Sequence, residues 1–323
     1  MINKNKIVLI FPGQGSQYTG MGLDYLDLSH KFKDYFKLAS DILKEDLTDI
    51  VFDKNGAGFK LENTLYSQIS IFTLSAVISD YLLDHYLKKD DIFAVTGHSL
   101  GDYSALYTGG YFSFKQSLDL VKYRGNLMAE ANEKMDGMMA AILGTDYNSL
   151  NDLLIKFKGR YKKEVYIANY NDYSQIVISG IRENMEKAIE FLKENGIKKV
   201  IPLKVRIASH TPLMMKVSRM LGDYVKSIML QEPFINFYSS TSQGYCKKEE
   251  IWSVLKDQLT SQINWVKTIE YFLNEDVNVF VETGPSKVLS GLVKRIADKN
   301  QKDILIFNTD RLSDLNNLKN FLS

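Results

Sequence analysis

The chain has 323 residues, of which 45% are hydrophobic and 24% are charged, and its formal net charge is +1. This composition is ordinary for a globular protein, the charge gives no reason to expect nucleic acid or a membrane as a partner, and no apolar run reaches the roughly 18 residues of a membrane-spanning helix. Cys246 is the only cysteine, which excludes an internal disulfide and favours a reducing compartment, so we expect a cytoplasmic protein.

The first predicted element is a continuously apolar strand over residues 6–11, as in a buried parallel sheet. It leads into Pro12-Gly13-Gln14-Gly15, where two glycines spaced by one residue indicate a loop whose backbone closely approaches another group. A phosphate-binding loop is one interpretation, but the Lys-Ser/Thr ending of that motif is absent. A loop that offers a backbone N–H to an oxyanion is the other interpretation.

A nucleophile elbow is predicted at Gly97-His98-Ser99-Leu100-Gly101. The motif follows a broadly apolar helix over residues 67–87 and a strand over residues 92–96, and a helical segment begins at residue 102. The turn between such a strand and helix is so sharp that only glycine fits beside the middle residue. The Ser99 hydroxyl is then held at a helix N-terminus, where backbone N–H groups stabilise a developing negative charge. A plain tight turn is the alternative interpretation.

The pattern changes after a predicted helix over residues 114–131, which carries Arg124 in its interior. The order strand, helix, strand, strand, helix, strand is typical of a ferredoxin-like unit. These elements are expected at residues 138–143, 149–157, 165–168, 175–179, 182–195 and 199–205. We therefore predict a small ferredoxin-like subdomain over residues 135–205, inserted into a large subdomain formed by residues 1–134 and 206–323.

The rest of the chain alternates between helices and strands. Helices are expected at residues 214–230, 248–259 and 287–297, and strands at residues 234–238, 277–282 and 304–307. This alternation predicts an α/β fold with a mainly parallel sheet that helices cover on both faces.

A serine nucleophile needs a base, and the chain has four histidines. His30 lies in a polar helical region, where we expect a solvated side chain. His85 lies near a helix end, where we expect a structural role. His98 neighbours Ser99 on the strained turn, where adjacent side chains point in different directions. His210 leaves a predicted strand just before a proline turn, a place where ligands gather in open α/β sheets. We therefore predict His210 as the base, with a structural histidine as the alternative.

Five motifs extend over nearly the full length of the chain. They are Phe11-Pro12-Gly13-Gln14-Gly15-Ser16-Gln17, residues 97–106, Arg124-Gly125-Asn126-Leu127-Met128, Ser209-His210 and residues 282–289. With these motifs in this order, the chain resembles the malonyl-CoA:acyl carrier protein transacylases, including the discrete acyltransferases that serve polyketide synthases. The resemblance implies a hydrolase-like large subdomain with a mainly parallel sheet and an inserted ferredoxin-like small subdomain.

The resemblance also implies the catalytic groups. Ser99 would carry the acyl group, and His210 would act as its base. The backbone N–H groups of Gln14 and Leu100 would form the oxyanion hole. The backbone carbonyl of Gln258 would orient His210 in place of the acid of a triad.

The resemblance further implies the substrate-binding residues. Arg124 would hold the malonyl carboxylate with Met128 beside it, and Asn171 would line the cleft. Ser209 stands where many malonyl-specific polyketide acyltransferases have a bulky aromatic residue, whereas some fatty-acid enzymes also have serine there, so the acyl group stays open. Asp102 stands where members of the family often have glutamate.

The implied reaction transfers a malonyl group from malonyl-CoA to the phosphopantetheine thiol of an acyl carrier protein, for fatty-acid or polyketide synthesis. It is a ping-pong reaction that needs no metal and no other cofactor. Because carrier proteins are usually acidic, a basic docking patch is expected. The candidates are Lys198, Lys199, Lys204 and Arg206, or Lys287, Lys294 and Arg295, with ordinary solvated surface as the alternative.

Three other functions fit the sequence less well. A conventional serine esterase or thioesterase has its histidine after the acid, late in the chain, but no histidine follows His210 here. An acyl hydrolase on the same scaffold, which edits carrier proteins, would have no use for Arg124, because neutral acyl chains need no cation. A non-catalytic docking subunit of a synthase would not need both Ser99 and His210. We therefore expect an acyltransferase.

Overall fold

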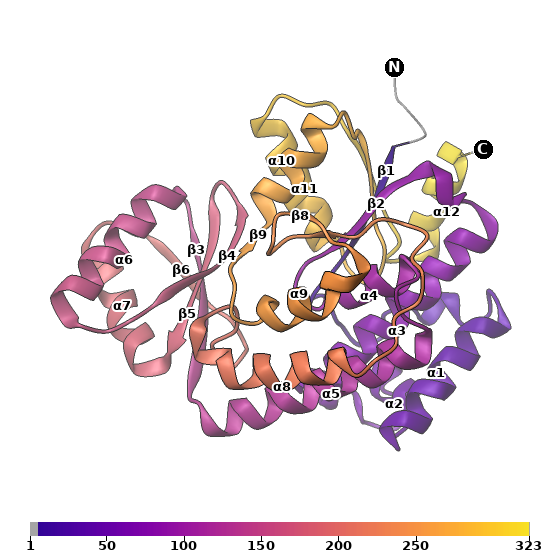
Figure 1. The fold of residues 1–323 in the computed structure, drawn as a ribbon, viewed down its shortest axis with the longest axis horizontal. Helices are drawn as coiled ribbons and strands as arrows, with labels where there is room; N and C mark the ends of the chain where they lie inside the picture. Colours follow the sequence, from indigo (N-terminus) through magenta and orange to yellow (C-terminus); the bar gives the residue numbers. More distant parts are fainter. Residues whose placement is uncertain (1–5, 323) are drawn as a thin grey trace.

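The computed structural model describes residues 6–322, so the first five residues and the last residue of the predicted ranges 1–134 and 206–323 lie outside the described residues. A large subdomain surrounds one sheet, and a smaller subdomain with its own sheet lies beside it (Figure 1). The predicted α/β fold class is confirmed. Within residues 6–322, no helix combines the length and the hydropathy that crossing a bilayer requires.

Within residues 6–322, the sheet of the large subdomain has four parallel strands in the order β11-β10-β1-β2. Their bounds are β1 (Ile7–Phe11), β2 (Ile92–Gly97), β10 (Val279–Glu282) and β11 (Leu305–Asn308). Phe11 pairs with Gly97, so the carboxyl ends of β1 and β2 lie side by side. This register brings the glycine loop after β1 next to the predicted elbow, at the edge where α/β sheets bind ligands.

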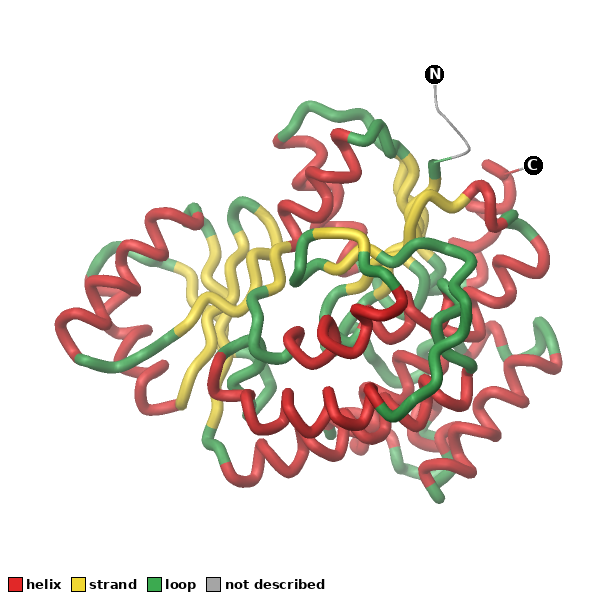
Figure 2. The backbone as a smooth tube through the Cα atoms, viewed as in Figure 1, coloured by secondary structure: helices red, strands yellow, loops and turns green. Residues whose placement is uncertain are grey.

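Side chains of β1 alternate between two hydrophobic cores, one on each face of the sheet. Leu9 and Phe11 belong to one core, Val8 and Ile10 belong to the other, and all four are fully buried. Helices therefore cover both faces of the sheet (Figure 2), as the alternation of elements predicted. The helices of the large subdomain, some of which pack on other helices, are α1 (His30–Leu43), α2 (Leu47–Phe52), α3 (Thr64–His85), α4 (Gly101–Thr108), α5 (Phe114–Lys134), α8 (Met215–Lys226), α9 (Ile251–Gln258), α10 (Trp265–Asn274), α11 (Val288–Lys299) and α12 (Leu312–Leu322).

The small subdomain contains the predicted ferredoxin-like unit. Its elements are β3 (Gly137–Leu143), α6 (Tyr147–Tyr161), β4 (Tyr166–Asp172), β5 (Gln175–Ile181), α7 (Arg182–Glu194) and β6 (Lys199–Pro202). The strands pair antiparallel in the order β6-β3-β5-β4. Ile142 and Ile178 on one face share a core with residues of α6 and α7, whereas Met139 and Val177 on the other face join the core of the large subdomain.

A short strand from outside residues 135–205 extends the small sheet. This strand, β9 (Ile263–Asn264), pairs parallel with β4 through Asn169 and Tyr170. The two subdomains therefore share a sheet edge as well as a packed interface.

The predicted strand over residues 234–238 is wrong for most of its length. Only β7 (Tyr238–Ser239) is a strand there, and it pairs with β8 (Gly244–Tyr245). Just before β7, Phe237 forms one isolated parallel bridge with Val95 of β2. Ile235 and Phe237 are buried, which explains the apolar pattern, but the N–H of Ile235 donates to the carbonyl of Gly109 in the loop after α4. Hydrophobicity alone did not distinguish a strand from a buried loop segment.

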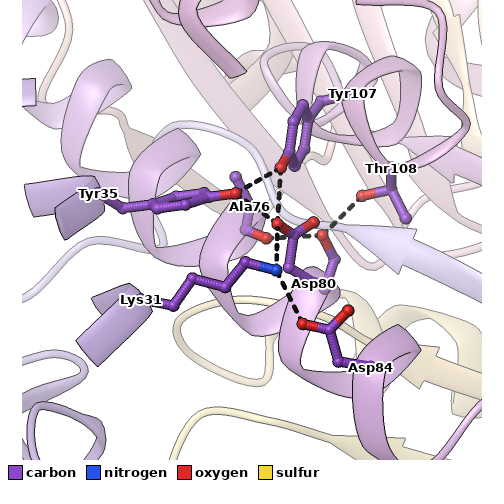
Figure 3. A network of polar contacts seen from close by, with 8 residues as sticks. Lys31, Tyr35, Ala76, Asp80, Asp84, Tyr107 and Thr108 are labelled. Carbon is purple, nitrogen blue, oxygen red and sulfur yellow. Dashed lines mark hydrogen bonds and ion pairs between the residues drawn. The ribbon is translucent and has the colours of Figure 1, made fainter. Parts of the chain in front are cut away.

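A polar network joins α1, α3 and α4 (Figure 3). Asp80 in α3 accepts hydrogen bonds from Tyr35 in α1 and from Tyr107 in α4, the second at 2.9 Å. Lys31 Nζ lies 3.2 Å from the same carboxylate and 2.8 Å from the carboxylate of Asp84. One carboxylate therefore satisfies donors from two other helices.

Asp80→Ala is expected to lower the free energy of unfolding by about 1–3 kcal/mol. The hydroxyls of Tyr35 and Tyr107 lie 2.8 Å apart, so one can then donate to the other, but the second loses its acceptor in a partly buried place. Urea denaturation measures this change. Asp84→Ala is the matched control: this side chain is 51% exposed and also pairs with Lys31. A change within about 0.5 kcal/mol is expected for the control. Equal losses in the two variants would contradict the stabilising role of the network.

Candidate active site

The predicted elbow forms the turn between β2 and α4. Ser99 has a φ of 54°, in the left-handed region that residues other than glycine rarely adopt. A Cβ on Gly97 would lie 2.0 Å from the carbonyl carbon of Gly101, and a Cβ on Gly101 would lie 2.0 Å from the carbonyl oxygen of Phe11. Neither position has room for a side chain, which is the physical reason for the two glycines that flank the serine.

The structure brings Ser99 and His210 together. His210 Nε2 lies 3.0 Å from Ser99 Oγ, and its Nδ1 lies 2.9 Å from the backbone oxygen of Gln258 and 3.2 Å from that of Ser261. Since a carbonyl can only accept, Nδ1 carries the ring proton and donates it. Nε2 is then left as an acceptor for the Ser99 hydroxyl, which is the geometry that general-base activation of a serine needs.

The surroundings of His210 keep its imidazole neutral. The side chain is buried, and burial, together with the nearby charge of Arg124, lowers its pKa to about 3, while the carbonyl of Gln258 acts in the opposite direction. A neutral imidazole is the form that accepts a proton. His210 is therefore ready to act as a base at neutral pH.

This lowered pKa predicts an unusual pH profile for loading of Ser99 from a thioester. A base works in its deprotonated form, so a histidine of ordinary pKa would lose roughly 30-fold in rate between pH 8 and pH 5. With a pKa of about 3, kcat/KM for loading should stay nearly flat over this range. Rapid-quench measurements between pH 5 and 8 test this, with circular dichroism as the control for folding. A decline with a midpoint near pH 6.5 would contradict it.

Arg124, in the interior of α5, points at the same serine. Its Nη2 donates to Ser99 Oγ at 3.1 Å, its guanidinium carbon lies 5.3 Å from the ring centre of Tyr103, and the residue is 1% exposed. Within residues 6–322 it forms no ion pair with a carboxylate, and its Nε has no hydrogen-bond partner. The buried carboxyl of Asp102 favours the charged guanidinium without forming an ion pair with it, and a buried cation without a direct carboxylate partner is costly. The site is therefore suited to a ligand that brings a carboxylate next to Ser99.

Two backbone N–H groups beside Ser99 are free to donate to a ligand. Gln14 follows β1 in the glycine loop, and a Cβ on Gly13 would lie 2.4 Å from the carbonyl oxygen of His98, so this loop touches the elbow. Leu100 follows Ser99 at the start of α4. In the described part of the chain, neither of these N–H groups donates to a protein acceptor. Both can stabilise an oxyanion that forms at Ser99, although that role stays a prediction.

The remaining predicted residues surround this centre. Met128 lies one helical turn after Arg124 on α5. Asn171 reaches the elbow, because His98 Nε2 lies 2.9 Å from its Oδ1. Ser209 is 5% exposed, and its Oγ has no hydrogen-bond partner among residues 6–322. Their roles toward a substrate stay predictions.

Sequence reasoning missed Gln68 and the carbonyl of Ser261. Gln68 in α3 is fully buried, and its Nε2 lies 3.2 Å from Sδ of Met128 and 3.4 Å from Oε1 of Gln14. A glutamine inside the apolar stripe of the predicted helix was an available signal for this residue. Nothing in the sequence pointed to the second carbonyl that faces the imidazole.

A cavity of about 340 Å³ lies beside His210, between the two subdomains. Its lining includes Tyr147 and Tyr166 from the small subdomain and Thr260 and Gln262 from the large one. No group of three or more His, Cys, Asp or Glu side chains in the described range 6–322 is arranged to hold a metal ion.

Comparison with known proteins identifies the family. Residues 8–306 match the acyl transferase domain family. The chain is 35% identical to the malonyl CoA-acyl carrier protein transacylase of Bacillus subtilis over 90% of both chains, and 33% identical to that of Haemophilus influenzae over 98% of this chain and 99% of the relative.

A solved structure has the same fold. This structure is the complex of PlMCAT, a malonyl-transacylase, with its holo type II PKS acyl-carrier protein AntF. The comparison gives a TM-score of 0.90 and 30% sequence identity, and it covers 98% of this chain and 99% of the matched chain. The predicted resemblance is thereby confirmed: the chain belongs to the acyl transferase domain family.

Proposed function

We propose that this protein transfers a malonyl group from malonyl-CoA to the phosphopantetheine thiol of an acyl carrier protein, through an acyl-Ser99 intermediate. The observation that carries the proposal is the buried guanidinium of Arg124, which has no carboxylate partner within residues 6–322 and lies 3.1 Å from Ser99 Oγ. The names of the relatives support both substrates: two are malonyl CoA-acyl carrier protein transacylases, and one solved relative holds an acyl-carrier protein.

In the first half-reaction, His210 Nε2 takes the hydroxyl proton of Ser99 while Oγ attacks the thioester carbonyl of malonyl-CoA. The oxyanion accepts hydrogen bonds from the N–H groups of Gln14 and Leu100. The carbon–sulfur bond then breaks, the proton on His210 passes to the CoA sulfur, and malonyl-Ser99 remains. The carbonyl of Gln258, 2.9 Å from Nδ1, stabilises the imidazolium that forms between these steps.

Arg124 orients the acyl group during this step. Its hydrogen bond to Ser99 Oγ is exchanged for two parallel bonds to the malonyl carboxylate, the geometry that a planar guanidinium favours. Met128 and Gln68, which contact each other at 3.2 Å, form the wall beside this carboxylate.

The second half-reaction follows the reverse route. The thiol of the carrier-bound phosphopantetheine gives its proton to His210, and its sulfur attacks the ester carbonyl of malonyl-Ser99. The ester bond breaks, and Ser99 Oγ takes the proton back from His210. In this ping-pong sequence, protons move only between the serine, the histidine and the two thiols, and each bond that breaks is replaced by one that forms. The reaction therefore needs no metal and no redox cofactor.

The two predicted basic clusters differ in their charge balance. Lys287, Lys294 and Arg295 each pair with a carboxylate, of Asp314, Asp298 and Asp172 respectively. Lys198, Lys199, Lys204 and Arg206 are exposed and form no ion pair within residues 6–322. We therefore favour the unpaired cluster of Lys198, Lys199, Lys204 and Arg206 as the cations that meet an acidic carrier protein. We also assign the enzyme to the cytoplasm, in line with its single, buried cysteine.

Intact-protein mass spectrometry after mixing with a panel of acyl-CoAs tests the proposal. A malonyl adduct is expected on the wild-type protein, transferable to a phosphopantetheinylated carrier protein. Ser99→Ala is expected to abolish the adduct. Loading of neutral acyl groups in preference to malonyl, followed by their release to water, would overturn the proposal in favour of an acyl hydrolase.

A further inference from the structure

One buried side chain links the nucleophile elbow to the base. Gln258, the last residue of α9, is fully buried, and its backbone oxygen accepts the Nδ1 hydrogen bond of His210. Its side-chain Nε2 donates to the backbone oxygen of Ser99 at 2.8 Å and to the carboxyl group of Asp102. Gln258 therefore bonds to the imidazole of His210, to the backbone of Ser99 and to a side chain in the first turn of α4.

The two reacting groups depend on such support. Ser99 and His210 have φ angles of 54° and 60°, so both stand in a backbone conformation that is unfavourable for their side chains. Residues in such conformations persist only where their surroundings hold them. The side-chain amide of Gln258 is one of the groups that hold the elbow, and its backbone carbonyl holds the imidazole.

Asp102 holds this amide in place. The residue is fully buried, and its Oδ2 accepts from Gln258, whereas its Oδ1 has no hydrogen-bond partner among residues 6–322. A carboxyl group buried in this way adds little to stability, and burial raises its pKa to about 7. Both protonation states keep an oxygen that can accept the N–H of Gln258.

We propose that Asp102 and the side chain of Gln258 form a positioning pair, which fixes the histidine-orienting carbonyl relative to the nucleophile elbow. Within residues 6–322, Asp102 forms no hydrogen bond with the Ser99 hydroxyl or the His210 imidazole; it acts through Gln258, and Asp102→Asn tests separately for the charge that it presents to Arg124. The inference rests on the proposed roles of Ser99 as nucleophile and His210 as base. It adds a side-chain function to a residue for which the family resemblance implies only a backbone carbonyl.

Single-turnover loading of Ser99 from malonyl-CoA tests the pair. Gln258→Met keeps the length of the side chain and the backbone carbonyl but removes both amide N–H groups, and Asp102→Leu removes the acceptor. Each is expected to lower the maximal loading rate constant by about 10–10²-fold, as a small misplacement of reacting groups does. The malonyl-CoA concentration for half-maximal rate should stay unchanged. Asp102→Asn keeps an acceptor oxygen and should restore a rate constant near that of the wild type.

The double variant Asp102→Leu/Gln258→Met should be no slower than the slower single variant, because both changes break the same link. Glu282→Gln is the matched control. Glu282 is also a fully buried carboxyl whose pKa burial raises to about 7, but it accepts from the N–H groups of Leu289 and Ser290 at the start of α11. This control should lower thermal stability without changing the loading rate constant.

Wild-type loading rates in Gln258→Met would overturn the positioning pair, and so would equal rate losses in Asp102→Leu and Asp102→Asn. If Asp102→Leu does not fold, Gln258→Met and Asp102→Asn still give these outcomes. Failure of the proposed function is a different result: the wild-type protein itself would then acquire no malonyl adduct on Ser99.

Discussion

Replacing His210 with alanine is expected to slow the loading of Ser99 by about 10²–10⁴-fold. The serine hydroxyl is a poor nucleophile at neutral pH, and the proposed base is the imidazole nitrogen that lies 3.0 Å from it. Rapid-quench loading from malonyl-CoA, followed by intact-protein mass spectrometry, measures the loss. A rate within a few-fold of the wild type would show that His210 is structural.

The groups that bond to the His210 imidazole lead to a second expectation for the same measurement. Nδ1 of His210 donates to two backbone carbonyls, and no Asp or Glu side chain within residues 6–322 bonds to the imidazole. Replacing any single Asp or Glu should therefore not reproduce the His210→Ala loss. Asp102→Leu, which acts through the Gln258 side chain, should cost less. A carboxylate whose removal matches His210→Ala, with the fold intact by circular dichroism, would contradict this account.

The elbow was predictable because its determinants are local. Two glycines, an apolar strand before them and a helix after them are adjacent in the chain, and the steric demand of the turn follows from these neighbours alone. The ferredoxin-like unit was predictable for a similar reason, since each of its strands and helices carries its own periodicity. The order of the elements then restricted the topology.

Contacts between distant segments could not be predicted from the residues alone. The contact between Ser99 and His210 spans 111 positions, and the bond from Gln258 to Asp102 spans 156. His210 was selected by eliminating the other histidines and by its place after a predicted strand, but that strand, β6, ends at Pro202 and belongs to the small antiparallel sheet. The carbonyl of Gln258 entered only through the resemblance. A buried amide such as that of Gln258 was not predicted, because glutamine lies mostly on exposed surfaces.

Arg124→Ala is expected to invert the acyl preference of the protein from malonyl-CoA towards acetyl-CoA. Removal of one partner of a buried ion pair costs roughly 3–5 kcal/mol, which corresponds to a loss of about 10²–10³-fold or more in malonyl loading. Acetyl-CoA has no carboxylate and should lose far less, or gain. The measurement is kcat/KM for both thioesters on the wild type and the variant.

The ratio of the two thioesters is more informative than either rate. Arg124 also lowers the pKa of His210 and donates to Ser99 Oγ, so its removal changes the reacting groups themselves. These changes affect both thioesters alike and cancel in the ratio. Only the interaction with the carboxylate remains, and that interaction is the one which defines a malonyl transferase.

Arg124→Lys separates charge from geometry. Lysine keeps the positive charge but cannot form two parallel hydrogen bonds to one carboxylate, so its malonyl preference should fall between those of the wild type and Arg124→Ala. A preference equal to that of the wild type would mean that charge alone selects the substrate. Equal losses for malonyl-CoA and acetyl-CoA in Arg124→Ala would instead mean that the guanidinium supports the fold through Tyr103. An acyl hydrolase would then explain the site better than a malonyl transferase, because a neutral acyl group makes no demand on a cation.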